Sequence, residues 1–160
     1  MRAFVIAAAS AAVLALSATA LAQQPGQSGT AAEARAMLMK AVAAVKTDKG
    51  KALDMFAKGE GGFLDRDLFP FCFNISDGTA HPFANPNGKQ FFGRDERTLK
   101  DPTGKAFGQE LYSVAAQNPE GQISEVSYMA ARPGTDTTPV PKVSFVTKVG
   151  DLGCGVGYYK

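Results

Sequence analysis

The side chains of this sequence that could do chemistry are few and far apart. The 160 residues include one histidine, His81, and two cysteines, Cys72 and Cys154. His81 with Cys72 is the one pair that could support nucleophilic catalysis, and no serine–histidine–aspartate arrangement has a supporting context. We expect Cys72 to be buried or bridged instead, and we predict that the protein is not an enzyme. No CxxC motif and no cluster of cysteines and histidines is present, so we expect no metal site and no cofactor.

The histidine lies in a predicted β-hairpin. Aromatic residues alternate with others over residues 69–75, which is typical of a strand with one aromatic face and one face that carries a thiol and an amide. Asp77 and Gly78 favour a tight turn, because glycine accepts the positive φ that such turns need. Residues 79–83 are then expected to return as a second strand that carries His81, and the prolines and asparagines that follow end it.

The start of the chain is typical of a secretory signal peptide. Over residues 1–22, Arg2 gives a positive start, residues 4–16 are apolar, and a small-x-small motif ends at Ala22. A retained membrane anchor is the alternative, which the short apolar run disfavours. Residues 23–29 are rich in glutamine, glycine, proline and serine and predict a flexible leader. We therefore expect a periplasmic protein that does not insert into the membrane after processing.

Charge and length limit the partners of the remaining chain. The formal net charge is +2, and no basic stripe is visible, which argues against nucleic acid and against an electrostatic membrane anchor. Residues 30–160 fit one domain of ordinary size. An exported protein can form disulfides, so a single bridge between the two cysteines is possible.

Two helices are predicted, one before the hairpin and one after it. Thr30 and Glu33 have the spacing of a capping box, in which each residue satisfies a backbone amide of the other. An apolar stripe at helical spacing then continues to Gly59, with an interruption or kink at residues 48–50. The second helix is expected over residues 105–117, where apolar residues again share one face.

Three further strands are predicted over residues 122–130, 140–149 and 152–159. The last of them has a glycine at every second position, at Gly153, Gly155 and Gly157. A face without side chains lets bulky groups approach closely, and we expect Phe71 and Phe73 to fill that space. The order of helix, two strands, helix and three strands predicts an α+β domain with an antiparallel sheet.

The stretch over residues 67–107, DLFPFCFNISDGTAHPFANPNGKQFFGRDERTLKDPTGKAF, resembles the start of a single Cache domain, an extracytoplasmic sensor module of bacterial chemoreceptors and histidine kinases. The segments VSYMAARPG, PVPKVSFV and LGCGVGYY resemble its last three strands, so the resemblance covers residues 30–160. It implies a PAS-like fold, with a five-stranded antiparallel sheet, a long N-terminal helix and a helical crossover between strands two and three. Members of the family bind small organic ligands, often short carboxylates, and do no chemistry.

The resemblance also implies a small-molecule pocket on one face of the sheet. A short carboxylate needs a cation or hydrogen-bond donors, with apolar walls around its tail. Lys142 is the candidate cation, His81 is a candidate second donor, and Tyr128 offers a hydroxyl. The candidate wall residues are Phe73, Phe92 and Phe145. Alternatively, His81 is only a turn residue and Lys142 points to solvent; Lys142 and Phe145 also have opposite parity, so a regular strand would not place them on one side.

The family fold places the first and last strands side by side. The resemblance therefore implies a disulfide between Cys72 and Cys154, and the alternative is two buried thiols that remain unpaired.

Together these expectations favour a periplasmic sensor or binding domain for a short organic acid or a similar small metabolite, with a role in signal transduction such as chemotaxis. No transmembrane helix or output domain follows in the sequence, so we expect a free-standing domain that passes binding to a separate partner, such as a membrane-bound receptor or histidine kinase. An accessory or adaptor protein of a membrane complex, without its own ligand, is the alternative. A small periplasmic hydrolase or isomerase is less favoured.

Overall fold

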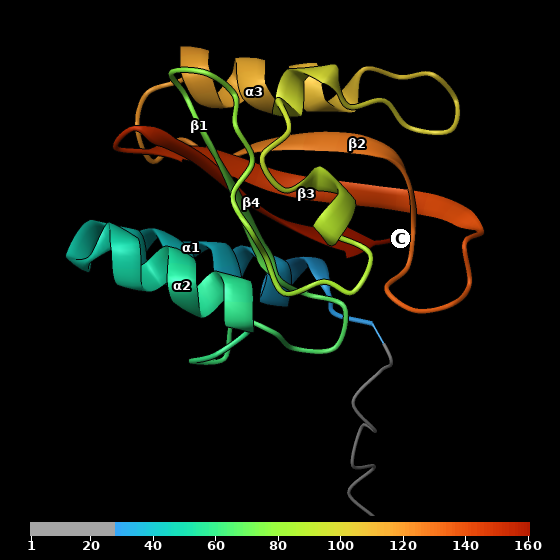
Figure 1. Ribbon diagram of the computed structural model, residues 1–160, viewed down its shortest axis with the longest axis horizontal. Helices are drawn as coiled ribbons and strands as arrows, with labels where there is room; N and C mark the ends of the chain where they lie inside the picture. The colour runs from blue at the N-terminus through green and yellow to red at the C-terminus, as the bar shows by residue number, and fades with distance from the viewer. Residues whose placement is uncertain (1–27) are drawn as a thin grey trace, which may run out of the picture.

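The structure, a computed structural model, describes residues 28–160 (Figure 1). The expected signal peptide and most of the expected leader lie outside the described residues. The elements of the described part follow in the order α1 (Ala31–Thr47), α2 (Lys49–Lys58), β1 (Pro70–Asn74), the 3-10 turns η1 (Lys89–Phe91) and η2 (Glu96–Thr98), α3 (Phe107–Gln117), β2 (Ser124–Ala131), β3 (Pro139–Val149) and β4 (Leu152–Tyr159). Within residues 28–160, no helix has both the length and the apolar character needed to cross a bilayer.

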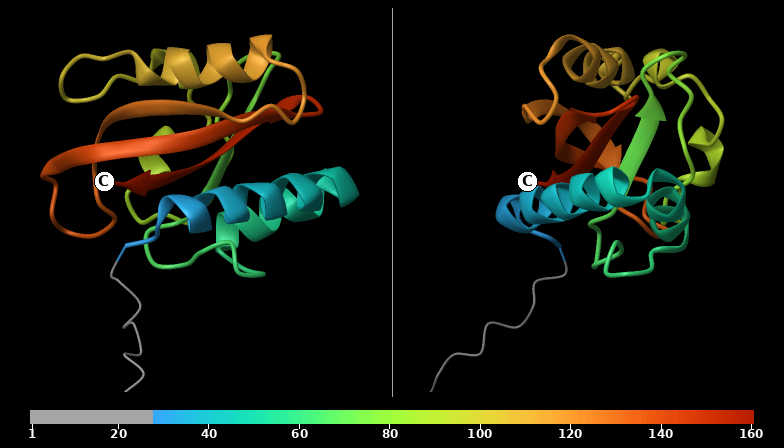
Figure 2. Two further views of the ribbon diagram at one scale, coloured as in Figure 1. Left: turned by 180° about the vertical axis from the view of Figure 1, so that it is seen from behind. Right: turned by 90° about the vertical axis from the view of Figure 1, so that its left-hand side faces the viewer.

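The centre of the molecule is a four-stranded antiparallel sheet in the order β1-β4-β3-β2. It lies between two helical layers, with α1 against one face and α3 against the other, and α2 beside α1 (Figure 2). Each face has its own apolar core, because side chains alternate between the two faces along every strand. The predicted α+β class is confirmed, and the boundaries of the three C-terminal strands lie within two residues of those expected.

The expected long N-terminal helix is in fact two helices that run side by side in opposite directions (Figures 1 and 2). The predicted capping box of Thr30 and Glu33 begins α1. Asp48 ends α1, because its backbone is extended, with φ of −157°, and its side chain accepts a hydrogen bond from the amide of Lys51 and so caps α2. The interruption that the sequence indicated at residues 48–50 is thus a reversal of the chain.

The five-stranded sheet that the resemblance implied has four strands here. Residues 79–83, expected as the second strand, make only isolated bridges, from Ala80 to Phe73 and from Thr79 to Asp95. Pro82 lacks an amide hydrogen, so the segment cannot extend its pairing with β1. The predicted helical crossover runs from this segment through η1 and η2 to α3.

The glycines of β4 allow two phenylalanines of β1 to lie flat against the sheet, as expected. In the register of β1 and β4, Phe71 is opposite Gly155 and Phe73 is opposite Gly153. A Cβ atom at either glycine would overlap the facing phenylalanine ring. These contacts are on the α3 side of the sheet, so the glycine pattern determines how closely the aromatic side chains approach that face.

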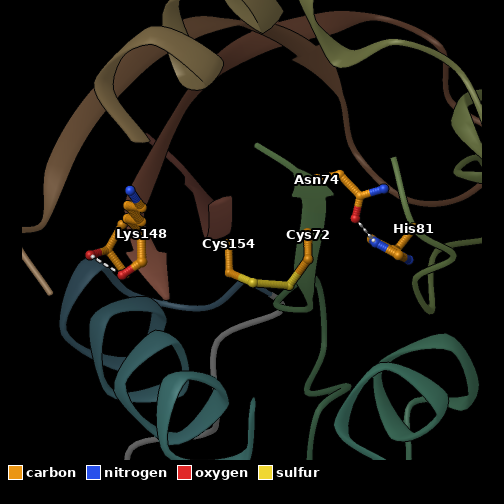
Figure 3. The surroundings of a disulfide bond; sticks show 6 residues. Cys72, Asn74, His81, Lys148 and Cys154 are labelled. Carbon is orange, nitrogen blue, oxygen red and sulfur yellow. Dashed lines mark hydrogen bonds between the residues drawn. A yellow bond between two sulfur atoms is a disulfide. The ribbon is translucent and has the colours of Figure 1, made fainter. Parts of the chain in front are cut away.

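The other face of the same two strands carries a disulfide between Cys72 and Cys154 (Figure 3). The two residues are direct partners in the register, and their Cα atoms are 4.1 Å apart. Both lie in the core that packs against α1. The predicted disulfide is confirmed, and the alternative of two unpaired thiols is excluded.

Candidate ligand-binding site

A cavity of about 690 Å³ lies between the α3 face of the sheet and the crossover that joins β1 to α3. This volume is within the range of small-molecule sites, which is about 300–1,000 Å³. Aromatic rings form a large part of its lining, together with polar residues that come mostly from the crossover; the aromatic residues are Phe69, Phe71, Phe83, Phe91, Phe107, Tyr128 and Tyr159. Strands β2, β3 and β4 form the floor, and residues 83–102 of the crossover form much of the opposite wall.

Lys142 of β3 lies on this floor and is only 6% exposed. The sheet register places it between Tyr128 of β2 and Tyr159 of β4 on the same face. Gly157 of β4 makes room for it, since a Cβ atom there would overlap the Cε of Lys142. Gly157 therefore leaves space for the side chain of Lys142, just as Gly153 and Gly155 leave space for the phenylalanine rings of β1.

The ammonium group of Lys142 is surrounded by aromatic rings. Its Nζ lies 5.0 Å from the ring centre of Phe69 and 4.6 Å from that of Tyr159. A long hydrogen bond of 3.4 Å joins Nζ to the Tyr159 hydroxyl, which itself donates to the backbone oxygen of Ala131 at 2.7 Å. Burial lowers the pKa of Lys142 to about 8, and the nearby charges of Asp67 and Arg132 act in opposite directions on it.

No carboxylate of residues 28–160 lies within ion-pair distance of Lys142. Asp67, the acidic residue whose charge affects the pKa of Lys142, is buried and has other partners. One of its oxygens accepts from the amide of Gly29 at 2.6 Å, and the other accepts from Arg132 at 3.1 Å. Lys142 is thus a buried cation without its own counter-ion, which is an arrangement suited to receiving an anion.

Tyr128 also lines the cavity, and its hydroxyl is 2.9 Å from the hydroxyl of Ser144 on the neighbouring strand. Its ring is stacked on Phe107 of α3, with ring centres 4.2 Å apart. Burial raises the pKa of Tyr128 well above its usual value, so it stays neutral. The hydroxyl can therefore accept or donate a hydrogen bond beside the lysine.

The other four residues expected in the pocket lie outside the cavity lining. Phe73 is in the core under α3, with its ring centre 6.0 Å from that of Tyr112. Phe145 is on the opposite face of the sheet, in the core under α1, as its parity relative to Lys142 requires. Phe92 packs edge-on against Phe83, which does line the cavity, so it supports the wall from behind.

His81 lies beside β1, next to Asn74 (Figure 3), and it is not part of the cavity lining. Its Nε2 is 2.8 Å from the side-chain oxygen of Asn74, and its backbone amide donates to the carbonyl of Cys72. Burial lowers the pKa of His81, so the neutral imidazole is favoured near neutral pH. Of the six expected ligand-binding residues, the cavity brings together Lys142 and Tyr128.

The structure adds a residue for which the sequence analysis predicted no role. Glu96, in the charged run of residues 94–97, is only 6% exposed and lines the cavity from η2. Burial and the neighbouring carboxylate of Asp95 raise the pKa of Glu96 to about 7. Nothing in the local pattern marks this residue, because the apolar residues that bury it come from distant parts of the chain.

Catalytic chemistry has little support in the described residues. Cys72 is bonded to Cys154, so the one cysteine–histidine pair has no thiolate to act as a nucleophile. Residues 28–160 hold no group of three or more histidine, cysteine, aspartate or glutamate side chains that could bind a metal ion. The geometry of the cavity is that of a binding site with one buried cation and aromatic walls.

Three solved structures of similar fold come from chemotaxis or chemosensory proteins. One is a periplasmic sensor domain of a chemotaxis protein, with TM-score 0.56 and 23% identity over 80% of this chain and 88% of that one. A methyl-accepting chemotaxis protein from Vibrio parahaemolyticus RIMD 2210633 has TM-score 0.59 and 21% identity, and the match covers 80% of this chain and 86% of that one. A Cache chemosensory domain, described for its recognition of carboxylic acids, has TM-score 0.55 and 20% identity, and the match covers 80% of this chain and 86% of that one.

Among curated proteins, no significant match was found. The scan against protein families matches single Cache domain 2 over residues 12–159, and it indicates no enzyme family. This match covers most of the chain and includes every helix and strand of the described fold. The chain therefore belongs to the single Cache domain 2 family.

Proposed function

We propose that this protein is a periplasmic sensor domain that binds a short organic acid, or a similar small metabolite, and passes the binding to a separate signalling partner. The observation that carries this proposal is Lys142, a cation buried in an aromatic cavity without a counter-ion among the described residues. Membership of the Cache family and the likeness to chemotaxis sensor domains support it. A membrane-bound receptor or histidine kinase is the kind of partner that this function needs.

The proposed binding mode follows from the positions of the side chains. The ligand carboxylate lies against Lys142, where it forms a charge-assisted hydrogen bond that is stronger than one between neutral groups. Tyr128, the cross-strand neighbour of Lys142 in the same cavity lining, donates a hydrogen bond to the second carboxylate oxygen in this binding mode. The aromatic walls surround the tail of the ligand and exclude water, which strengthens the interaction with the lysine. The cavity has room for acids larger than acetate.

A thermal-shift screen of carboxylates, amines and amino acids tests the proposal. A ligand that binds only the folded protein raises its melting temperature, and calorimetry then gives the affinity. We expect carboxylates to stabilise the protein and Lys142→Met to abolish that effect. Lys148→Met is the matched control, because Lys148 is on the same strand but outside the cavity lining. If no small molecule stabilises the protein, the alternative of an adaptor without its own ligand is favoured.

The proposed location rests on the leader sequence and is tested separately. Export should remove residues 1–22, so mass spectrometry of periplasmic protein is expected to find Gln23 at or next to the N-terminus. The disulfide in a buried position of the fold agrees with an oxidising compartment. An intact Met1 on the protein in cells would contradict the proposed processing.

A further inference from the structure

The cavity contains a second buried group that can carry a charge. Glu96 of η2 is as buried as Lys142, with 6% exposure, and it lines the same cavity from the crossover side. Leu99 and, on α3, Phe107 and Leu111 line the cavity beside it. A carboxyl group in such apolar surroundings is unfavourable unless a partner satisfies it.

The chain itself supplies no such partner among residues 28–160. Glu96 forms no ion pair there, and no hydrogen bond from the described residues reaches its carboxyl group. No buried side-chain oxygen of these residues is both sealed off and unpartnered, so the Glu96 oxygens still reach accessible space. The neighbouring carboxylates differ in this respect. Asp95 is bound by the guanidinium of Arg97 at 2.7 Å, and Asp101 accepts from the hydroxyl of Thr103 and from the amide of Met129. Glu96 is therefore the carboxyl group of this region that is left available to a ligand.

The backbone holds Glu96 in this position. Its amide donates to the carbonyl of Gly78 at 2.8 Å, which joins η2 to the turn after β1. Gly108 of α3 lies directly against the Glu96 carbonyl, and a Cβ atom at Gly108 would overlap it. The close contact between η2 and α3 fixes the residue at the cavity wall, so its burial is a consequence of the fold rather than of one side-chain conformation.

Lys142 and Glu96 thus come from opposite walls of one cavity, the sheet and the crossover, and they are not paired with each other. The other two lysines of the lining, Lys89 and Lys100, are exposed. The interior of the cavity therefore presents one group for an anion and one for a cation. The stacked rings of Phe107 and Tyr128 add faces that attract cations.

We infer that Glu96 determines specificity and that the ligand is a zwitterionic amino-carboxylate, with its carboxylate on Lys142 and its ammonium group on Glu96. This inference rests on the proposed function and narrows its ligand class. A plain carboxylate would satisfy Lys142 but would leave the Glu96 carboxylate without an opposite charge, in a position where burial disfavours its ionised form. A ligand ammonium group supplies three donors and a charge, and it removes that penalty.

The test compares ligands that differ only in the amine. Calorimetry measures propionate against β-alanine, butyrate against γ-aminobutyrate, and valerate against δ-aminovalerate, with γ-hydroxybutyrate as a neutral donor. The series of lengths locates the spacing that reaches from Lys142 to Glu96. We expect one amino-carboxylate to bind at least about tenfold more tightly than its plain analogue, which corresponds to about 1.4 kcal/mol.

Glu96→Gln should abolish this preference and leave the affinity for the plain acid unchanged, because the amide has the same shape but no charge. Glu96→Leu is a second variant with the same expectation, in which no polar atom remains at the wall. Glu125→Gln, at an exposed position of β2, is the matched control and should behave as the original protein. Circular dichroism confirms that each variant is folded.

The failures of the two proposals can be distinguished. If plain acids bind and the amino-carboxylates bind no better, or the hydroxy acid binds best, the inference of a zwitterion is overturned and the proposed function stands. Equal losses for plain and amino ligands in Glu96→Gln would also overturn the specificity role. If no member of the series binds the original protein, the inference is overturned, and the wider thermal-shift screen decides the proposed function separately.

Discussion

Replacing Lys142 by methionine should abolish binding of a carboxylate and, at the same time, make the unliganded protein more stable. Methionine has a similar length and can occupy the channel over Gly157, but it has no charge to desolvate. In the folded protein the pKa of Lys142 is lowered to about 8 from its usual 10.5, because burial disfavours the ammonium form. The ammonium group therefore destabilises the folded state at neutral pH.

The magnitude follows from this shift. One pKa unit corresponds to about 1.4 kcal/mol. The lowered pKa of Lys142 therefore reduces the free energy of unfolding by roughly 3 kcal/mol below pH 8. The contacts with the rings of Phe69 and Tyr159 offset part of it, by about 0.5–1 kcal/mol each. We expect Lys142→Met to raise the free energy of unfolding by about 1–2 kcal/mol at pH 7.

The pH dependence of stability provides a second measurement with a defined sign. Between pH 8 and pH 10.5 the unfolded chain binds a proton at Lys142 more readily than the folded protein does, so the original protein becomes more stable as the pH rises through this window. The difference in free energy of unfolding between Lys142→Met and the original protein should therefore decrease as the pH rises from 8 to 10.5. Urea unfolding at pH 7 and at pH 10, together with calorimetry of a carboxylate that the original protein binds, measures both effects.

Two results would refute the reasoning. If Lys142→Met is less stable than the original protein at pH 7, the lysine contributes to folding and is not an unsatisfied cation. If the variant still binds the carboxylate with the original affinity, the anion site lies elsewhere. Lys148→Met controls for the loss of a lysine from the same strand, and it should change neither the affinity nor the slope between pH 8 and pH 10.5.

Three more predictions use other groups of the fold. Because the pKa of Glu96 is raised from 4.5 to about 7, its folded form holds the proton more tightly than the unfolded chain, so the unliganded protein should lose stability as the pH rises from 4.5 to 7, and Glu96→Gln should flatten this dependence in urea titrations. Thiol titration of the denatured, unreduced protein should find neither Cys72 nor Cys154 free, and reduction should lower the free energy of unfolding by about 4–5 kcal/mol, since the bridge spans 82 residues. His81→Gln tests the expected role of His81 in the site: because its ring bonds to Asn74 outside the cavity, calorimetry should find an unchanged affinity, and a weaker one would link this edge of the sheet to the ligand.

Much of the fold could be predicted because its signals are local or periodic. The alternation of side chains along the strands, the capping box at Thr30 and the glycines at every second position of β4 each have one simple structural reading. The errors were at two positions where a single residue decides the geometry. Asp48 takes an extended conformation and reverses the chain, and Pro82 prevents residues 79–83 from forming a full strand.

The candidate site was harder to predict because it is built from residues that are distant in the sequence. Lys142 stood out as a lysine among apolar neighbours in a strand, and the parity argument correctly separated it from Phe145. Glu96 had no comparable signal. Its burial depends on the close approach of η2 to Gly108, a tertiary contact that no pattern around residues 94–97 indicates.

The two faces of the sheet contribute differently to stability and to binding. On the α3 face, the buried Lys142 and Glu96 each destabilise the unliganded protein, on the order of 3 kcal/mol apiece from their pKa shifts. On the α1 face, the bridge between Cys72 and Cys154 restricts the unfolded chain, which stabilises the folded protein by about 4–5 kcal/mol. A cavity that holds two buried ionisable groups requires stability from elsewhere in the fold, and the disulfide between β1 and β4 supplies much of it from the other face of the sheet. After reduction, the original protein should therefore unfold at a lower urea concentration than reduced Lys142→Met or reduced Glu96→Gln. A bound ligand should raise the urea midpoint of the reduced original protein and so remove part of this difference.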